Sequence, residues 1–146
     1  LIEDNNFYIR HILVTHSHKP NISGIRTLLK IYDAEIYSAS DQILSFPSNV
    51  IVPDSSLNLS EIEVEVMKFP GHSEDSLVYK IGEMLFTGDT LCAGNLGDKE
   101  NKETMEIISK SVSAKIKDMN DSILVFPGHG PPSTIKAEKD FNPELS

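Results

Sequence analysis

The sequence predicts a mixed α and β fold, of the α+β class, in which helices pack on sheets. Three observations support this prediction. Residues 62–69 alternate apolar and acidic side chains, and residues 102–119 repeat apolar side chains at helical spacing. A period of two is typical of a half-buried strand, whereas a period of 3.6 is typical of a helix. The third observation is that strands alternate with helices in parts of the chain and follow one another directly elsewhere.

The first half of the chain is expected to contain short strands and one helix. Apolar patterns predict strands at residues 11–15, 34–39 and 50–52 and a helix at residues 22–32. Ser40 and Asp41 resemble a helix cap and predict a short helical turn. Residues 47–58 are rich in proline, serine and asparagine, so most of this segment is expected to be loop.

The second half reads as strands that end in glycine-rich turns, with two helices. Residues 62–69 predict a strand that stops at Pro70, and residues 77–87 predict a hairpin that turns at Gly82. A helix is expected at residues 102–119. The segment "SILVFPGHG" then predicts a strand that ends in a turn, followed by a terminal helix that starts near residues 132–134.

Length and composition favour one soluble domain spanning residues 1–146. The chain has 146 residues, of which 39% are apolar, which is enough for one core but too little for two. Thirteen basic and 22 acidic residues give a net charge of −9, which argues against nucleic-acid and anionic-membrane partners. The apolar runs are too short to span a bilayer or to form a signal peptide.

The cysteine content bears on the cellular compartment. Cys92 is the single cysteine of the chain, so an internal disulfide is ruled out and a reducing, cytoplasmic setting is expected. Its apolar neighbours favour a small packed residue over a nucleophile.

The side chains that carry chemistry collect in loops that follow strands, where functional residues tend to gather. These residues are His16, His18, His72, His129 and Asp89. Taken one at a time, each also fits a plain surface, turn or helix-cap residue. Taken together, imidazoles and a carboxylate are ligands that suit zinc, iron or a similar ion. The two residues that flank Ser17 would point to the same side of a strand and could reach one ion.

Five segments in order resemble the metallo-beta-lactamase fold, and within it the glyoxalase II-like (hydroxyacylglutathione hydrolase-like) branch. They are "ILVTHSHKPNISGI", "KFPGHSEDSLVYKI", "MLFTGDTLCAGNLGD", "VFPGHGPPSTI" and "EKDFNPEL". The resemblance implies an αββα sandwich with a metal site at the edge between two sheets. It also implies that His16, His18 and His72 hold a first ion, that His129 belongs to a second site, and that Asp89 bridges both.

The first departure from the family concerns the motif His-x-His-x-Asp-His. Its Asp position is Pro20 and its last His position is Asn21 in this sequence. Proline offers no ligand, and a neutral amide oxygen is a poor ligand for a borderline ion. Asp89 and His129 alone are too few to hold a second ion tightly, so one zinc ion is expected rather than two, with iron as the alternative metal.

Two further departures concern the start of the chain and one loop. Only 15 residues precede His16, whereas family members usually carry opening strands there. The first sheet is therefore expected to lack its N-terminal strands, leaving an edge that another chain completes or that favours self-association into a homo-oligomer. The loop "GNLGDKENKE" lacks the arginine that relatives often place near the substrate.

Three functions stay open on this sequence. The first is a metal-dependent hydrolase of a small thioester or related ester, in which Asp89 is a fourth ligand or orients the water. Loss of the motif Asp at Pro20 would slow it by about 10²- to 10⁴-fold. The second is a mononuclear iron enzyme like the persulfide dioxygenases, using His16, His72 and Asp89, although those enzymes usually retain the motif Asp and His. The third is an inactive binding or scaffold domain.

Overall fold

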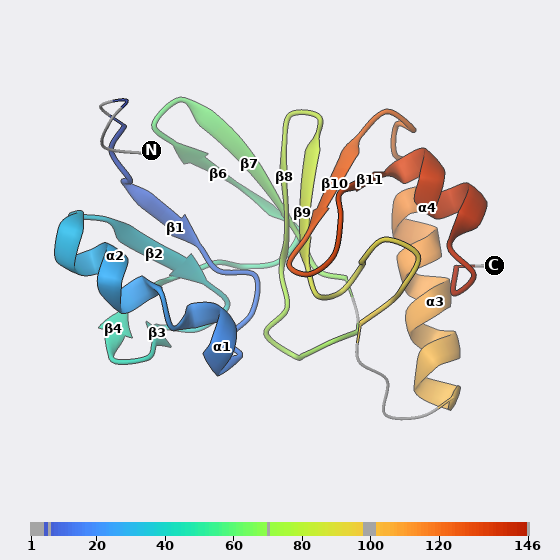
Figure 1. Ribbon diagram of the computed structural model, residues 1–146, viewed down its shortest axis with the longest axis horizontal. Coiled ribbons are helices and arrows are strands. Elements are labelled where there is room, and N and C mark those ends of the chain that lie inside the picture. Colours follow the sequence, from blue (N-terminus) through green and yellow to red (C-terminus); the bar gives the residue numbers. More distant parts are fainter. Residues whose placement is uncertain (1–4, 6, 70, 98–101, 146) are drawn as a thin grey trace.

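The computed structural model describes residues 5, 7–69, 71–97 and 102–145 (Figure 1). The helices in the described residues are α1 (Lys19–Ile22), α2 (Ile25–Ile31), α3 (Lys102–Lys117) and α4 (Ile135–Phe141). The strands are β1 (His11–Leu13), β2 (Glu35–Ser38), β3 (Gln42–Ile43), β4 (Phe46–Pro47), β5 (Asn49–Val50), β6 (Ser55–Leu59), β7 (Ile62–Met67), β8 (Val78–Ile81), β9 (Met84–Gly88), β10 (Leu124–Pro127) and β11 (Ser133–Thr134).

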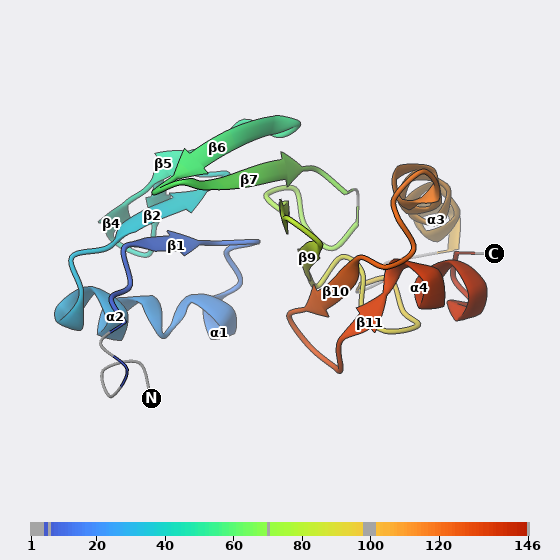
Figure 2. The same cartoon turned by 90° about the horizontal axis from the view of Figure 1, so that it is seen from above.

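The elements form four layers. Within the described residues, one sheet has the strand order β1-β2-β5 and a larger one the order β11-β10-β9-β8-β7-β6, while β3 and β4 form a small hairpin. Helices α1 and α2 lie on the outer side of the first sheet, and α3 and α4 lie on the outer side of the second (Figures 1 and 2). The predicted αββα sandwich is therefore confirmed. Within the described residues, strand β1 forms one edge of the first sheet.

Three apolar clusters fill the spaces between these layers. Neighbouring residues of one strand belong to different clusters, because their side chains point to opposite faces of the sheet. Ile36 faces the helix side of the first sheet, whereas its neighbour Tyr37 packs between the sheets. Val78 belongs to the cluster under α3 and α4, whereas Tyr79 belongs to the cluster between the sheets. Successive side chains of a strand point to opposite faces, so each sheet can contribute to two cores.

Strand direction brings several loops to one edge of the larger sheet. Strands β7 and β9 both pair antiparallel with β8, so they run in the same direction. Strand β10 pairs in parallel with β9, with Val125 opposite Leu85. The carboxyl ends of β7, β9 and β10 therefore meet at the same edge, and the loops that follow these strands carry His72, Asp89 and His129.

Two cross-sheet hydrogen bonds attach the end of β1 to this edge. The buried Tyr79 hydroxyl donates to the Val14 carbonyl oxygen at 2.7 Å, and the Leu77 backbone N–H donates to the Thr15 carbonyl oxygen at 2.8 Å. Burial raises the pKa of Tyr79 above its usual value, so its hydroxyl stays a donor. Because Thr15 directly precedes His16, these bonds set where the first histidine motif meets the second sheet.

The structure also corrects the sequence prediction in the first half of the chain. Ser40 and Asp41 open the β3–β4 hairpin and not a helical turn. The predicted loop at residues 47–58 contains β5 and all but one residue of β6, which pairs along its length with β7. Leu57 and Leu59 pack between the sheets while Ser56 and Asn58 face outward, so β6 has a period-two pattern that its polar composition obscured.

The long helix predicted at residues 22–32 is two helices, which meet near Gly24. The first begins earlier than expected, at Lys19, with a proline in its first turn, where the missing N–H costs no helical hydrogen bond. The strand, hairpin and long helix predicted between residues 62 and 119 are confirmed as β7, β8–β9 and α3. None of the helices in the described part of the chain has the length and hydropathy needed to cross a bilayer.

The Tyr79 hydroxyl is expected to contribute measurably to stability. Tyr79→Phe leaves the buried Val14 carbonyl without this donor, which should lower the free energy of unfolding by about 1–3 kcal/mol. Tyr37→Phe is the matched control, because its hydroxyl bonds the exposed Glu35 at 2.6 Å and its loss should cost less than about 0.5 kcal/mol. Urea unfolding of both variants compares the two costs, and equal costs would contradict the cross-sheet role.

Candidate metal centre

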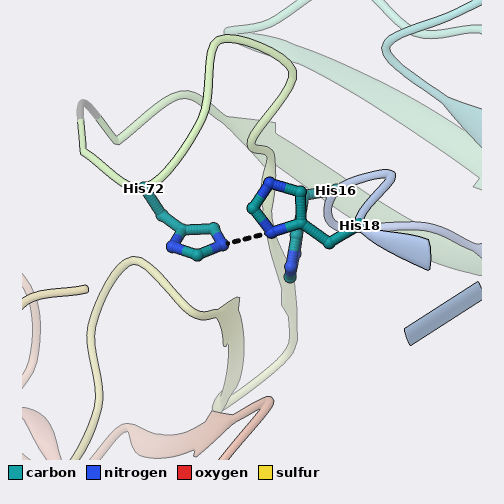
Figure 3. A group of neighbouring side chains, drawn as sticks. All are labelled: His16, His18 and His72. Carbon is teal, nitrogen blue, oxygen red and sulfur yellow. Dashed lines mark hydrogen bonds between the residues drawn. The ribbon is translucent and has the colours of Figure 1, made fainter. Parts of the chain in front are cut away.

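Three histidines from two distant segments converge at the edge between the sheets. One ring nitrogen from each of His16, His18 and His72 lies within 4.8 Å of the others. Figure 3 shows the three rings facing one another, with His72 Nε2 2.8 Å from His18 Nδ1. His16 is buried, His72 is half-buried and His18 is exposed. The first two follow β1 and the third follows β7, so the two sheets together build the cluster.

Asp89 connects this cluster to His129. Its Oδ2 lies 3.4 Å from His16 Nε2 and 3.8 Å from His72 Nε2. Its other oxygen, Oδ1, lies 2.8 Å from His129 Nδ1. The two carboxylate oxygens therefore face two different groups. All five candidate residues predicted from the sequence lie in one region, with His129 reaching the histidine cluster through Asp89.

Burial keeps His16 in the form that can bind a metal. Burial lowers the pKa of His16 below its usual value; the nearby His72 and His18 lower it further, while the Asp89 carboxylate works against them. Thr15 Oγ1 lies 3.1 Å from His16 Nδ1, which leaves Nε2 directed toward Asp89. A hydrogen bond to the remote ring nitrogen is a common way to orient a histidine ligand.

Close approach of the backbone explains the glycines of the Gly-Asp and Pro-Gly-His segments. A Cβ on Gly128 would lie 2.5 Å from Asp89 Oδ1. Gly88 has φ +55°, and a Cβ there would lie 2.8 Å from both Cβ and Oγ1 of Thr15. Glycine at position 88 therefore lets the Asp89 loop pack against Thr15, and glycine at position 128 lets the His129 loop pack against Asp89.

A pocket of about 450 Å³ opens beside these side chains. Its walls include His72, Asp89, Cys92 and His129. Cys92 therefore lies at the pocket, although the sequence indicated only a packed residue. Burial and the negative charge of Asp89 raise the pKa of its thiol, against a hydrogen bond from the His129 backbone N–H, so the thiol is protonated at neutral pH.

The terminal segment "EKDFNPEL" holds the loop that forms the far wall of this pocket. The buried Glu138 accepts a hydrogen bond from the Gly94 backbone N–H at 3.2 Å, and Glu144 accepts one from the Leu96 backbone N–H at 2.6 Å. Asn142 donates to Glu138 at 2.7 Å. The terminal segment therefore fixes the backbone of this pocket loop.

Several residues around the site were missed from the sequence. Thr15, Asp75 and Glu138 carry no pattern of their own, although all three lie within segments that carried the family resemblance. Pro20 and Asn21 lie in α1, and their side chains fall outside the described residues. So do residues 98–101 of the loop for which substrate contacts were considered.

Comparison with known proteins agrees with this geometry. The sequence is 30% identical over 133 residues to the hydroxyacylglutathione hydrolase of Francisella tularensis subsp. novicida (strain U112), covering 88% of this chain and 52% of that protein. An uncharacterised protein of Treponema pallidum (strain Nichols) is 27% identical, with 91% of this chain and 70% of that protein covered. The chain thus spans about half the length of the hydroxyacylglutathione hydrolase that it matches. No family model matches the sequence.

Solved structures show the same fold. The BLEG-1 B3 metallo-beta-lactamase superimposes with a TM-score of 0.85 at 22% identity, covering 99% of this chain and 81% of that one. ETHE1 from Myxococcus xanthus gives a TM-score of 0.83 at 23% identity, covering 97% and 65%. The chain has the metallo-beta-lactamase fold, and its relatives in sequence support a place in the metallo-beta-lactamase superfamily. Its relatives in sequence support the glyoxalase II-like branch of this superfamily.

A third solved structure has the same fold as this chain. TTHA1623 in a di-iron-bound form has a TM-score of 0.79 at 20% identity, covering 97% of this chain and 80% of that one. The iron named for that structure belongs to that protein; for this chain, the three-histidine cluster is the observation that suggests a metal cofactor.

The packing of Gly88 against the first histidine motif can be tested with a matched pair of glycines. Gly88→Ala should cost more stability than Gly82→Ala. Both glycines have φ +55°, so both variants carry the left-handed backbone cost of about 1–3 kcal/mol. A Cβ at Gly82 meets no heavy atom within 4 Å in the described part of the chain, whereas one at Gly88 overlaps Thr15. Overpacking should therefore add about 1–3 kcal/mol at Gly88, measured by urea unfolding. Equal losses would show that the Gly88 loop does not pack tightly on Thr15.

Proposed function

We propose that this chain is a metal-dependent hydrolase that works with one divalent ion, most simply zinc, on a small thioester or related ester. The observation that carries the proposal is the convergence of His16, His18 and His72 within 4.8 Å, beside the Asp89 carboxylate. Three imidazoles with a further open position are typical of catalytic zinc sites.

The ring nitrogens of the cluster are arranged more suitably for binding a cation than for hydrogen-bonding one another. His72 Nε2 and His18 Nδ1 are 2.8 Å apart, so in the absence of a cation one of these nitrogens must carry a proton toward the other. His72 Nδ1 is buried and finds no hydrogen-bond partner within the described residues, so no carbonyl or carboxylate there fixes the tautomer of this ring. A divalent ion among the three rings would satisfy the facing lone pairs at once. The lowered pKa of His16 supports the same reading, since a ligand must be neutral.

The role proposed for each residue follows from the position of its side chain. When bound, such an ion supplies Lewis acidity, which activates water near neutral pH and polarises an acyl carbonyl. His16, His18 and His72 would hold it. Asp89 would be a fourth ligand through Oδ2 or would orient the attacking water, and His129 would keep the carboxylate in place through Oδ1. The adjoining pocket of about 450 Å³ has the size of small-molecule sites.

A single ion is proposed because the second site lacks ligands. Pro20 and Asn21 stand where relatives carry Asp and His, so Asp89 and His129 are left for a second ion. These two are already hydrogen-bonded to each other at 2.8 Å. The substrate class rests on the relatives called hydroxyacylglutathione hydrolases, which makes a hydroxyacyl thioester the first substrate to test.

A second candidate function is an iron-dependent oxygenase. The observation that favours it is that His16 and His72 both face Oδ2 of Asp89, at 3.4 and 3.8 Å. Two histidines and one carboxylate with open positions are the ligand set of non-haem Fe(II) oxygenases. In this alternative His18 would lie beside the iron without binding it.

The hydrolase proposal predicts one metal ion and metal-dependent turnover. Metal-free protein incubated with zinc and then dialysed should retain about one zinc per chain and should hydrolyse a hydroxyacyl thioester of glutathione. Loss of a residue that only hydrogen-bonds a metal ligand typically weakens metal binding by roughly 10- to 100-fold. Because His72 is a proposed ligand itself, His72→Ala should weaken zinc binding by more than that. His11→Ala is the control, because His11 lies in β1 outside the cluster and bonds Ser60 at 3.1 Å.

Elemental analysis and a thiol-release assay provide the two measurements. Two tightly bound ions, or none, would contradict the single-ion hydrolase. One bound ion without turnover of any thioester, lactone or phosphodiester would instead favour a binding or scaffold domain.

The oxygenase alternative has its own experiment. Protein loaded with Fe(II) under anaerobic conditions is mixed with a persulfide and then with oxygen, and oxygen uptake is recorded by electrode. The hydrolase proposal expects no uptake above that of free Fe(II), whereas stoichiometric uptake that is abolished in Asp89→Asn would establish the oxygenase instead.

A further inference from the structure

The loop that follows His72 contains an acidic residue, Asp75, that the family resemblance assigns no role. The loop belongs to the segment "KFPGHSEDSLVYKI" and connects β7 to β8. Its half-buried carboxylate lies between the two segments that supply the histidines.

Asp75 contacts both of these segments directly. Its Oδ2 accepts a hydrogen bond from the Ser17 backbone N–H at 2.9 Å, and Ser17 is the residue between His16 and His18. Its Oδ1 accepts one from the Ser73 hydroxyl at 2.7 Å, and Ser73 directly follows His72. One carboxylate thus joins two histidine segments that are far apart in the sequence.

The surrounding loop is organised to hold this carboxylate. Ser76 is buried, and its hydroxyl lies 2.7 Å from the Ser73 hydroxyl and accepts from the Ser73 backbone N–H at 3.2 Å. Leu77 donates to Thr15 at 2.8 Å, so the loop contacts the chain on both sides of His16. The Leu77 contact fixes the approach to His16, and the Asp75 contact fixes the chain between His16 and the exposed His18.

The hydrogen bonds also keep Asp75 ionised. Burial alone would raise the pKa of Asp75, but the hydrogen bonds from Ser17 and Ser73 outweigh burial and hold it below the usual value. A hydrogen bond to a charged acceptor is stronger than one between neutral groups.

The geometry points to Asp75 as a positioning residue that holds the His16–His18 segment against the His72 loop and so preorganises the three-histidine cluster for a divalent ion. This inference rests on the proposed function, because it takes that cluster to be the metal site. Residues that orient ligands typically contribute 10- to 100-fold to metal affinity.

Two substitutions separate positioning from charge. Asp75→Ala removes both hydrogen bonds. Asp75→Asn removes the charge but can keep both bonds, since its amide oxygen accepts from Ser17 and its NH₂ donates to the Ser73 hydroxyl, which can also accept. Glu74→Ala is the control, because it deletes an acidic side chain from the adjacent exposed position.

The first measurement is amide hydrogen exchange of Ser17 in the metal-free protein, read by NMR. Asp75→Ala should speed this exchange by about tenfold or more, the effect expected when a hydrogen bond to a charged group is lost. Asp75→Asn and Glu74→Ala should leave it near the wild-type rate. Unchanged exchange in Asp75→Ala would overturn the inference whether or not the protein binds metal.

The second measurement is zinc affinity, obtained by competition with a chromophoric chelator. Asp75→Ala should weaken zinc binding by about 10- to 100-fold, and Asp75→Asn should restore most of it. Equal weakening in Asp75→Asn would assign the effect to charge and would overturn positioning. A wild-type protein that binds no zinc would refute the proposed hydrolase, and the Ser17 exchange rate would still decide whether Asp75 positions the segment.

Discussion

The attachment of the end of β1 to the second sheet is the interaction on which the site depends. Tyr79 and Leu77 donate to the carbonyl oxygens of Val14 and Thr15, the last two residues before His16. Breaking these bonds would leave a carbonyl oxygen in the core without a donor, which costs free energy. The two sheets are therefore held in the arrangement that keeps both bonds. This attachment places the approach to His16, where the first histidine motif begins.

The second sheet supplies the rest of the site through strand direction. Strands β7, β9 and β10 run in the same direction, so the three loops that follow them meet at one edge of the sheet. Strand direction alone brings them together, and no contact between their side chains is needed for this. Asp89 then joins the groups, with one oxygen toward the buried histidines and the other toward His129. One carboxylate therefore links the buried histidines to His129.

Much of the site and most of the second sheet could be predicted from the sequence. Residues 62–67 and 78–88 have clear period-two or apolar patterns, and the histidines and Asp89 stand in short motifs directly after strands. Strand β6 was missed because serine and asparagine dominate it, and the β3–β4 hairpin was missed because Ser40 and Asp41 resemble a helix cap. Their strand conformation comes from pairing with β7 or with each other, which composition does not reveal.

The sequence by itself determined which candidate ligand types are present and in what order, and the family resemblance predicted that Pro20 and Asn21 stand at two ligand positions of the family motif. These are local facts, since each depends on one residue and its neighbours in the chain. Only the tertiary structure decided that Asp75 binds the segment between His16 and His18, that Glu138 holds the pocket loop, and that Cys92 faces the pocket. Such contacts join residues tens of positions apart, and only the packing of two sheets and their helices brings them together.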